Sequence, residues 1–327
     1  MTEKTIPAAA GANPNVTRSR LVLEIASEMA GSAASTVVPA YVQPRVVLRH
    51  AHGGKAATFL GVSTAEGIFA VASREVDLAM INPATVLSVA LRGRGIFKEP
   101  MPVRAIAVIP SWDQFVFAVR PETGLSSVED IARRKPKLRI LMRGAPDHTL
   151  HHMFDDVAAA AGFSRDDIAR WGGEMRKAGS VPWPHTETFK ALIRGDVDAI
   201  FDEAATCWVP QALDAGITIL PLAEQTVATL EAMGYRRAIL PRSTYHKLPR
   251  DVLSLDFSGW TVFVHAEADD DLVTQICAGL LARKARIPWE EPGELPVERM
   301  AREAPDTPQT VPLHPAAERF WRSRGYL

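Results

Sequence analysis

Polar and charged side chains follow several short apolar runs of this sequence, at the points where buried strands would end. Asn82, Arg143 and Asp202 each come at or directly after such a run. The carboxyl ends of strands in an α/β sheet face the crevice in which ligands bind. An arginine there can bind a carboxylate through a planar fork of N–H groups, and a neighbouring helix start also favours anions. This spacing predicts a binding site for a small organic anion.

Further candidates lie in the same kind of position. Ser63 and Thr64 stand where a helix is predicted to begin, and such side chains commonly cap the helix. Two roles remain open for Arg143, which are contact with a ligand and a pair with Asp147 in a helix expected to start at Pro146. As a ligand contact, Arg143 should affect binding much more than stability when it is truncated. The remaining candidates beyond a strand or at a helix start are Thr85, Thr149 and Trp208.

A group of histidines gives a second chemical hypothesis. His148 and His152 have the i, i+4 spacing that helical metal ligands use. Together with His151 they are expected on the face opposite Leu150 and Phe154, where they would be solvated. We therefore predict no metal site and no cofactor. The histidines considered as alternative acid–base groups are His50, His52 and His148.

Two segments share one pattern, and this pattern predicts the fold. Residues 63–82 and 186–202 each contain a helical stretch, a polar break, an aspartate and a short apolar strand. This order is typical of a parallel α/β layer. Asp77 and Asp198 are expected to hold turns rather than ligands. The repeated pattern predicts an α/β fold of two Rossmann-like lobes with ligand between them.

The domain organisation follows from the way the chain leaves the first half and returns after Gly234. A first strand is expected over residues 21–25. The predicted parts are a flexible N-terminal tail (1–19), lobe I (20–115 plus 252–327), lobe II (116–251), two crossover strands near 115–120 and 252–264, and a Pro- and Glu-rich surface strap (286–315).

Composition limits the class of protein. The chain has 327 residues, 47% of them hydrophobic and 23% charged, with a net charge of −1. These values are typical of a folded globular protein and offer no basic surface for nucleic acid. No apolar signal-peptide core is found in residues 1–20, so a cytoplasmic location is expected, or a periplasmic one if an export signal has been removed. Cys207 and Cys277 are expected to be buried free thiols, although a disulfide between them stays open.

Four segments together resemble the TAXI solute-binding proteins of TRAP transporters. They are the helix-to-strand unit 63–82, the segment Gly124-Leu-Ser-Ser-Val-Glu-Asp-Ile131, the segment Ala191-Leu-Ile-Arg-Gly-Asp-Val-Asp-Ala-Ile-Phe201 and the segment Leu240-Pro-Arg-Ser-Thr-Tyr245. The segment Leu313-His-Pro-Ala-Ala317 also looks like the family's tail. Their order and spacing, rather than any single segment, carry the resemblance. Three loops that usually bind ligand in this family are altered, at residues 31–35, 63–67 and 145–149.

The resemblance implies a type II periplasmic-binding-protein fold whose two lobes close on a small, usually carboxylated solute. It adds Tyr245 to the candidate ligand-binding residues, and it implies a monomer that works with a TRAP membrane permease. The alternative hypothesis is a cytoplasmic enzyme or ligand sensor on the same fold. Such a protein would act on an aromatic or dicarboxylic acid through the histidines named above.

Overall fold

The computed structural model describes residues 14–31, 43–49, 55–62 and 64–327. The chain separates into two compact units, residues 1–44 and residues 45–327. In the first unit, residues Pro14–Gly31 form the helix α1.

The strand expected over residues 21–25 is wrong, because these residues lie inside α1. Leu, Glu, Ala and Met are strong helix formers, and they make up seven of the ten residues from Leu21 to Ala30. Residues 14–19 of the expected tail belong to this helix, and residues 1–13 lie outside the described residues.

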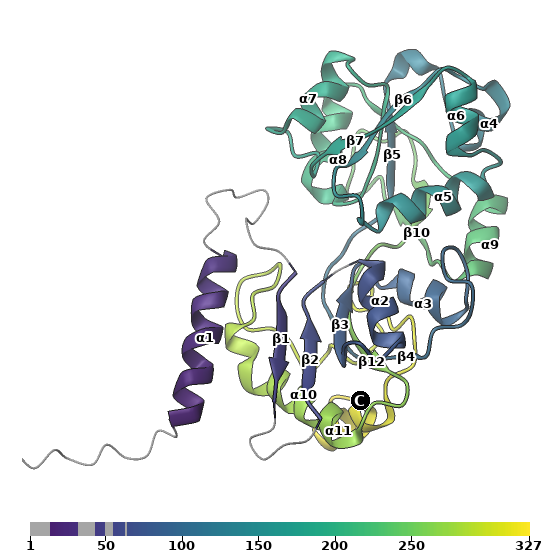
Figure 1. The fold of residues 1–327 in the computed structure, drawn as a ribbon. Helices are drawn as coiled ribbons and strands as arrows, with labels where there is room; N and C mark the ends of the chain where they lie inside the picture. Colours follow the sequence, from purple (N-terminus) through teal and green to yellow (C-terminus); the bar gives the residue numbers. More distant parts are fainter. Residues whose placement is uncertain (1–13, 32–42, 50–54, 63) are drawn as a thin grey trace, which may run out of the picture. The chain divides into compact units, whose positions relative to one another are not determined.

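The second unit contains two five-stranded mixed sheets (Figure 1). The first sheet, with its helices, is called lobe I here. Its strand order is β1 (Arg45–Leu48), β2 (Ala57–Leu60), β3 (Leu78–Ile81), β12 (Trp260–His265) and β4 (Val103–Ile109), and its helices are α2 (Ala65–Ala72), α3 (Thr85–Leu91), α10 (Asp270–Arg283) and α11 (Pro315–Ser323).

The second sheet and its helices form lobe II. Its strand order is β7 (Glu174–Gly179), β6 (Arg139–Arg143), β8 (Ala199–Asp202), β5 (Val116–Val119) and β9 (Thr218–Ile219). Its helices are α4 (Glu129–Arg134), α5 (Leu150–Ala160), α6 (Arg165–Arg170), α7 (Glu187–Arg194), α8 (Ala205–Asp214) and α9 (Glu224–Met233). A separate antiparallel pair, β10 (Arg237–Leu240) and β11 (Val252–Leu255), follows α9.

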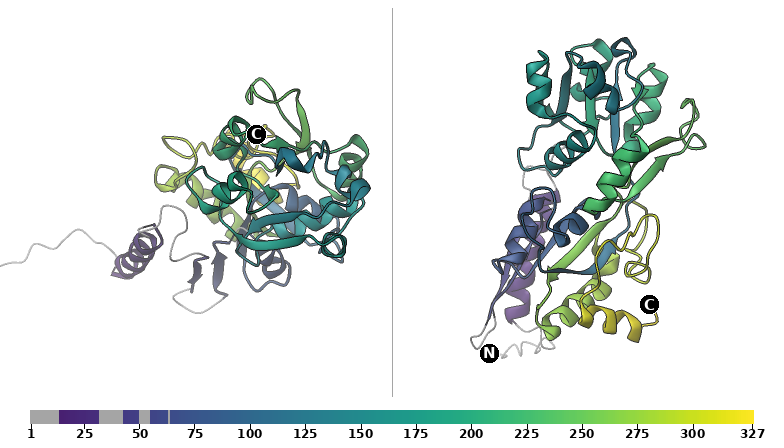
Figure 2. Two further views of the ribbon diagram at one scale, coloured as in Figure 1. Left: turned by 90° about the horizontal axis from the view of Figure 1, so that it is seen from above. Right: turned by 90° about the vertical axis from the view of Figure 1, so that its right-hand side faces the viewer.

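Two segments connect the lobes (Figure 2). The chain passes from β4 to β5 through residues 110–115 and returns from β11 to β12 through residues 256–259. The two crossing segments are hydrogen-bonded to each other, with Phe257 N donating to Asp113 O at 3.0 Å and Gly259 N donating to Ser111 O at 2.9 Å. The predicted α/β fold of two lobes with two crossovers is confirmed.

The two repeated aspartates fix neighbouring strands. The Asp77 carboxylate accepts a hydrogen bond from Thr58 N at 2.8 Å. The Asp198 carboxylate accepts one from Arg139 N at 2.8 Å and two more from the Arg139 guanidinium. Each aspartate therefore joins the start of its own strand to the adjacent one, and neither lines the pocket described below.

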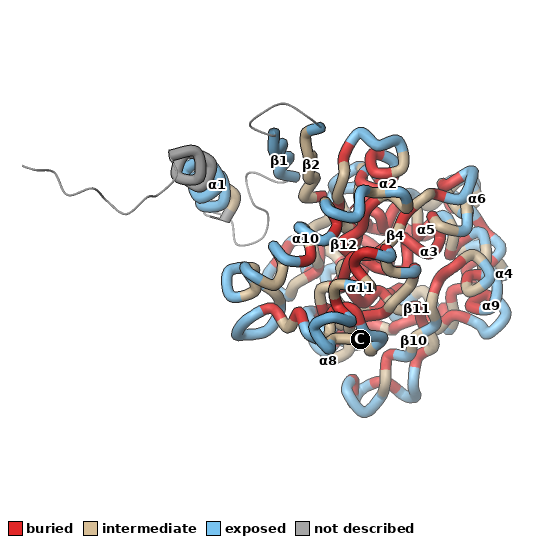
Figure 3. The backbone as a smooth tube through the Cα atoms, turned by 90° about the horizontal axis from the view of Figure 1, so that it is seen from below, coloured by how far each residue is buried: buried red, intermediate tan, exposed pale blue. Residues whose placement is uncertain are grey.

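The segment 286–315 is more than a surface strap, which corrects the prediction. Leu295, Val297 and Met300 are fully buried, and Met300 O accepts a hydrogen bond from Val108 N in β4 at 2.8 Å. In Figure 3 the buried residues, in red, run along β4 and β12. The buried side chains of this segment and of α11 belong to the same core cluster as those of both strands. The apolar side chains within the Pro- and Glu-rich composition therefore complete the core of lobe I.

Both cysteines are free thiols, but only Cys277 is buried, so the expectation of a buried Cys207 is wrong. Burial raises the pKa of Cys277 to about 12. Among the described helices, none is both long and apolar enough to cross a membrane.

Candidate functional site

A pocket of about 280 Å³ lies between the two lobes, next to the crossing segments. Its walls contain residues that follow strands of both sheets, namely Asn82 after β3, Arg143 at the end of β6 and Glu203 after β8. The other lining residues are Thr64, Ser111, Asp113, His148, Thr149, Val181, Ala204, Trp260 and Glu290. A larger groove of about 730 Å³ is lined by residues of lobe I alone.

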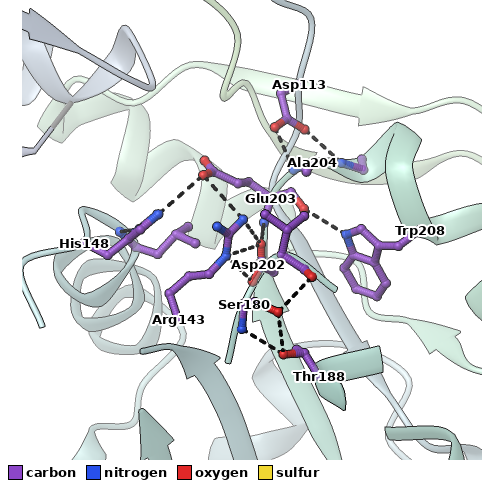
Figure 4. A network of polar contacts seen from close by, with 12 residues as sticks. Asp113, Arg143, His148, Ser180, Thr188, Asp202, Glu203, Ala204 and Trp208 are labelled. Carbon is purple, nitrogen blue, oxygen red and sulfur yellow. Dashed lines mark hydrogen bonds and ion pairs between the residues drawn. The ribbon is translucent and has the colours of Figure 1, made fainter. Parts of the chain in front are cut away.

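Arg143 is held by Asp202 in a bidentate ion pair (Figure 4). Nε and Nη2 of Arg143 donate to the Asp202 carboxylate at 2.8 and 2.7 Å. Two N–H groups directed at one carboxylate are the geometry of a strong charge-assisted pair. The structure therefore gives Asp202, and not Asp147, the role of the expected partner.

The ion pair is deeply buried. Asp202 is 1% exposed, and burial raises the pKa of its carboxyl although Arg143 acts in the opposite direction. Burial alone would lower the pKa of Arg143, but attraction to Asp202 raises it, so the guanidinium stays protonated. Asp202 therefore neutralises Arg143, and it is not among the residues that line the pocket.

Glu203 is the lining residue whose charge is least compensated. The residue is 8% exposed, and its Oε1 lies 3.8 Å from Arg143 Nη2 and 3.9 Å from His148 Nε2, both beyond hydrogen-bonding distance. Its Oε2 has no hydrogen-bond partner among the described residues. Burial is the largest influence on this carboxyl and raises its pKa to about 8.

Asp113 joins a crossing segment to lobe II. Its carboxylate accepts hydrogen bonds from Ala204 N at 2.6 Å and Ala205 N at 3.0 Å, which are the free N–H groups at the start of α8. It also accepts one from Gln114 N at 2.7 Å. Burial raises the pKa of Asp113 to about 7, against the effect of these backbone hydrogen bonds.

Lobe I contributes neutral polar groups to the pocket. Thr64 is the N-cap residue of α2, but its buried hydroxyl makes no capping bond and has no partner among the described residues. Asn82 precedes a cis peptide bond to Pro83, and its Nδ2 lies 3.5 Å from Gly259 O. These two groups are available to form hydrogen bonds with a solute.

The turn before α5 places His148 and Thr149 at the pocket. The helix begins at Leu150 and not at Pro146, because residues 144–149 form turns. His148 Nδ1 accepts a hydrogen bond from Leu150 N at 3.3 Å, which assigns the proton of the neutral ring to Nε2. Burial and the charge of Arg143 lower the pKa of His148 to about 3, so the ring is neutral at pH 7.

The prediction that the histidines lie on a solvated face of the helix is wrong for His151. This residue is 3% exposed, and its Nε2 lies 2.9 Å from Ala145 O. The turn at residues 144–149 folds back over the first turn of α5 and covers the ring, which the helical spacing alone did not reveal.

Several predicted site residues lie away from the pocket. Thr85 is buried and its hydroxyl lies 3.4 Å from Gly234 O. Trp208 and Tyr245 belong to the core of lobe II, and Trp208 Nε1 donates to Glu203 O at 2.8 Å. The candidates that fall outside the described residues are His50, His52 and Ser63.

Four residues predicted to bind the ligand do line the pocket, namely Thr64, Asn82, Arg143 and Thr149. His148, which was predicted as an acid–base group under the alternative hypothesis, lines it as well. The sequence reasoning missed Ser111 and Asp113, whose position in a crossover could have indicated the cleft. It also missed Trp260, at the start of β12, and Glu290, which comes from the distant C-terminal segment.

The chain is thus a two-lobed α/β protein with two adjacent crossings and a polar pocket between its lobes. The chain belongs to the NMT1-like family, whose model matches residues 60–325. No curated protein matches the chain.

Several solved structures show low similarity to this chain. The alkanesulfonate-binding protein SsuA from Xanthomonas axonopodis pv. citri, bound to MOPS, is 17% identical with a TM-score of 0.33, over 68% of this chain and 62% of that one. A TctC solute-binding protein from Polaromonas is 15% identical with a TM-score of 0.34, over 67% of each chain. Tv2483 bound to L-arginine is 11% identical with a TM-score of 0.32, over 68% of this chain and 66% of that one. At this similarity the neighbours carry no argument about a ligand.

Proposed function

We propose that this chain is a solute-binding protein that holds a small molecule between its two lobes. The observation that carries the proposal is the shared pocket, to which both sheets and a crossing segment contribute side chains. A solute in this pocket would contact both lobes at once, and it would therefore stabilise their closed arrangement. The volume of about 280 Å³ suits a small organic molecule.

Both lobes contribute hydrogen-bonding groups to the pocket. Thr64 and Asn82 supply a hydroxyl and an amide from lobe I, while His148 supplies an Nε2–H from lobe II. Convergent polar groups of this kind fix the orientation of a solute and give specificity.

A finer form of the proposal is the TAXI-like receptor of a TRAP transporter that binds a carboxylate in the periplasm. The charge of Arg143 and the unpartnered hydroxyl of Thr64 support it. Because Nε and Nη2 of Arg143 already bind Asp202, a carboxylate would lie beside the guanidinium rather than in its fork.

The alternative of an enzyme depends on His148 among the described histidines at the pocket. A general base needs a free ring nitrogen that can accept a proton. His148 Nδ1 already accepts a hydrogen bond from Leu150 N, and its Nε2 carries the proton. This arrangement favours binding by His148 over proton abstraction.

The test is a thermal-shift screen of small acids, amines and neutral polar solutes, followed by calorimetry on each solute that raises the melting temperature. A solute bound in the pocket should lose about tenfold in affinity with Thr64→Val, which removes one neutral hydrogen bond and keeps the shape. Thr229→Val is the matched control, because the Thr229 hydroxyl is exposed and bonds only within α9. Wild-type affinity in both Thr64→Val and Asn82→Ala would place the bound solute elsewhere and contradict the proposal.

A further inference from the structure

Glu203 is a buried carboxylate that faces the pocket without a partner that satisfies it. The residue is more than nine-tenths buried and lines the pocket, and its Oε2 makes no hydrogen bond among the described residues. A buried charge is strongly destabilising unless it is paired and hydrogen-bonded. Such a group in a folded protein therefore needs an explanation.

The charged groups around Glu203 leave an excess of negative charge. The single guanidinium, Arg143, is bound bidentately by Asp202, which is itself deeply buried. His148 is neutral and directs its Nε2–H toward Glu203 from 3.9 Å. Asp113 lines the same pocket and adds further negative charge.

Glu290 adds another carboxylate from the side of lobe I, and its Oε1 accepts a hydrogen bond from Ser111 at 2.6 Å. The groups that line the pocket therefore include three carboxylates and one guanidinium that is already neutralised. Burial raises the pKa of Asp113 to about 7 and that of Glu203 to about 8, so this excess of negative charge develops as pH rises through these values. A solute that brought only negative charge would then meet it without relief.

From these contacts we propose that the solute carries a protonated amine or amidine that binds the carboxylate of Glu203. A nitrogen cation in the pocket would donate a charge-assisted hydrogen bond to this carboxylate and would compensate its charge in one step. The neutral donors Thr64 and Asn82, on lobe I, would then bind acceptor atoms elsewhere on the same solute. This inference rests on the proposed function, because it names the class of solute for the same pocket.

The pH dependence of binding provides an independent measurement. Without solute, burial raises the pKa of Glu203 to about 8, so much of this carboxyl is protonated at neutral pH. A bound cation favours the ionised form, so binding releases a proton. Affinity for an amine should therefore rise between about pH 6 and about pH 9, while affinity for a carboxylate should fall.

The experiment compares two pairs of probes of similar shape, in which a nitrogen compound is matched with a carboxylate. The pairs are benzamidine with benzoate and γ-aminobutyrate with glutarate, and the affinity of the full chain for each compound is measured by calorimetry. In each pair we expect the nitrogen compound to bind more tightly. Glu203→Gln should weaken that binding at least about thirtyfold, which is the lower range for truncating one partner of a buried charged pair. Glu298→Gln, on an exposed glutamate, is the matched control.

The variant should stay folded, because the carboxylate that it removes is buried and its Oε2 has no hydrogen-bond partner among the described residues. Amine binding at wild-type strength in Glu203→Gln, or amine affinity that falls with rising pH in the wild type, would overturn the inference. Preferred binding of benzoate and glutarate would overturn it as well but leave the proposed function intact. Failure of both pairs and of the wider solute screen would contradict the proposed function itself.

Discussion

Truncation of Arg143 should lower stability strongly, although the sequence suggested that it would mainly affect binding. Arg143→Ala removes both N–H groups that bind Asp202 and leaves a carboxylate that is 1% exposed with the hydrogen bond from Glu203 N. Loss of one partner of a buried pair costs about 3–5 kcal/mol. In a chain of this size that loss lowers the melting temperature by roughly 6–15 °C.

The dependence on pH has a definite sign. Burial already raises the pKa of Asp202, and loss of Arg143 removes the group that lowers it. In the variant, Asp202 therefore binds a proton in the folded state at a pH where the unfolded chain has lost it. Folding stability then falls as pH rises, so the effect of Arg143→Ala should be largest at alkaline pH and shrink toward about pH 4.

The assay is urea unfolding followed by circular dichroism at several pH values. The double variant Arg143→Met/Asp202→Leu should recover most of the loss, because two apolar side chains then replace the pair. Arg194→Ala is the control, since Arg194 forms exposed ion pairs and should leave the midpoint near the wild-type value. If Arg143→Ala unfolds within about 1 kcal/mol of the wild type, the ion pair does not hold lobe II together and our reasoning is refuted.

Three further predictions concern single substitutions. Gly234→Ala should lower the free energy of unfolding in urea by about 1–3 kcal/mol, because φ at this position is +121° and the new Cβ would lie 2.9 Å from Val89 N. An unchanged unfolding midpoint would show instead that α9 can shift away from α3. Tyr235→Phe should cost about 1–3 kcal/mol, because it removes the 2.7 Å hydrogen bond from the buried Tyr235 hydroxyl to the half-buried Asp156 carboxylate. A loss below about 0.5 kcal/mol, the range of surface substitutions, would contradict this. The stability of Glu203→Gln relative to the wild type should increase as pH rises from about 4 to about 8. Burial raises the pKa of Glu203, so the wild type loses stability over this range and the variant does not. Parallel pH profiles of the two melting temperatures would exclude the effect.

Local patterns were sufficient to predict most of the fold. The aspartate that precedes each of β3 and β8 and the short apolar runs after it identified both α/β lobes, and the order of elements identified both crossings. The prediction failed for α1, where a five-residue window was too short to separate strand from helix. It also failed for the start of α5, because Pro146 lies in a turn that continues for three more residues.

The site could be predicted only in part, for a physical reason. Strand ends can be located from sequence, so Asn82 and Arg143 were identified. Whether a charged group is free or neutralised depends on residues that are far apart, as with Arg143 and Asp202, which are separated by 59 positions. The same limit concealed the unpartnered state of Glu203 and the arrival of Glu290 from the C-terminal segment.

The paired crossing segments have a mechanical consequence. Because residues 111–115 and 255–259 are hydrogen-bonded along their length, they form one narrow ribbon rather than two independent tethers. Asp113 attaches this ribbon to the start of α8, so its lobe II end moves with lobe II. Such a ribbon permits rotation about one axis and resists twisting of one sheet against the other. We therefore expect any opening of the pocket to be a rotation about one axis, which would return the residues that face each other across it to the same register on closing.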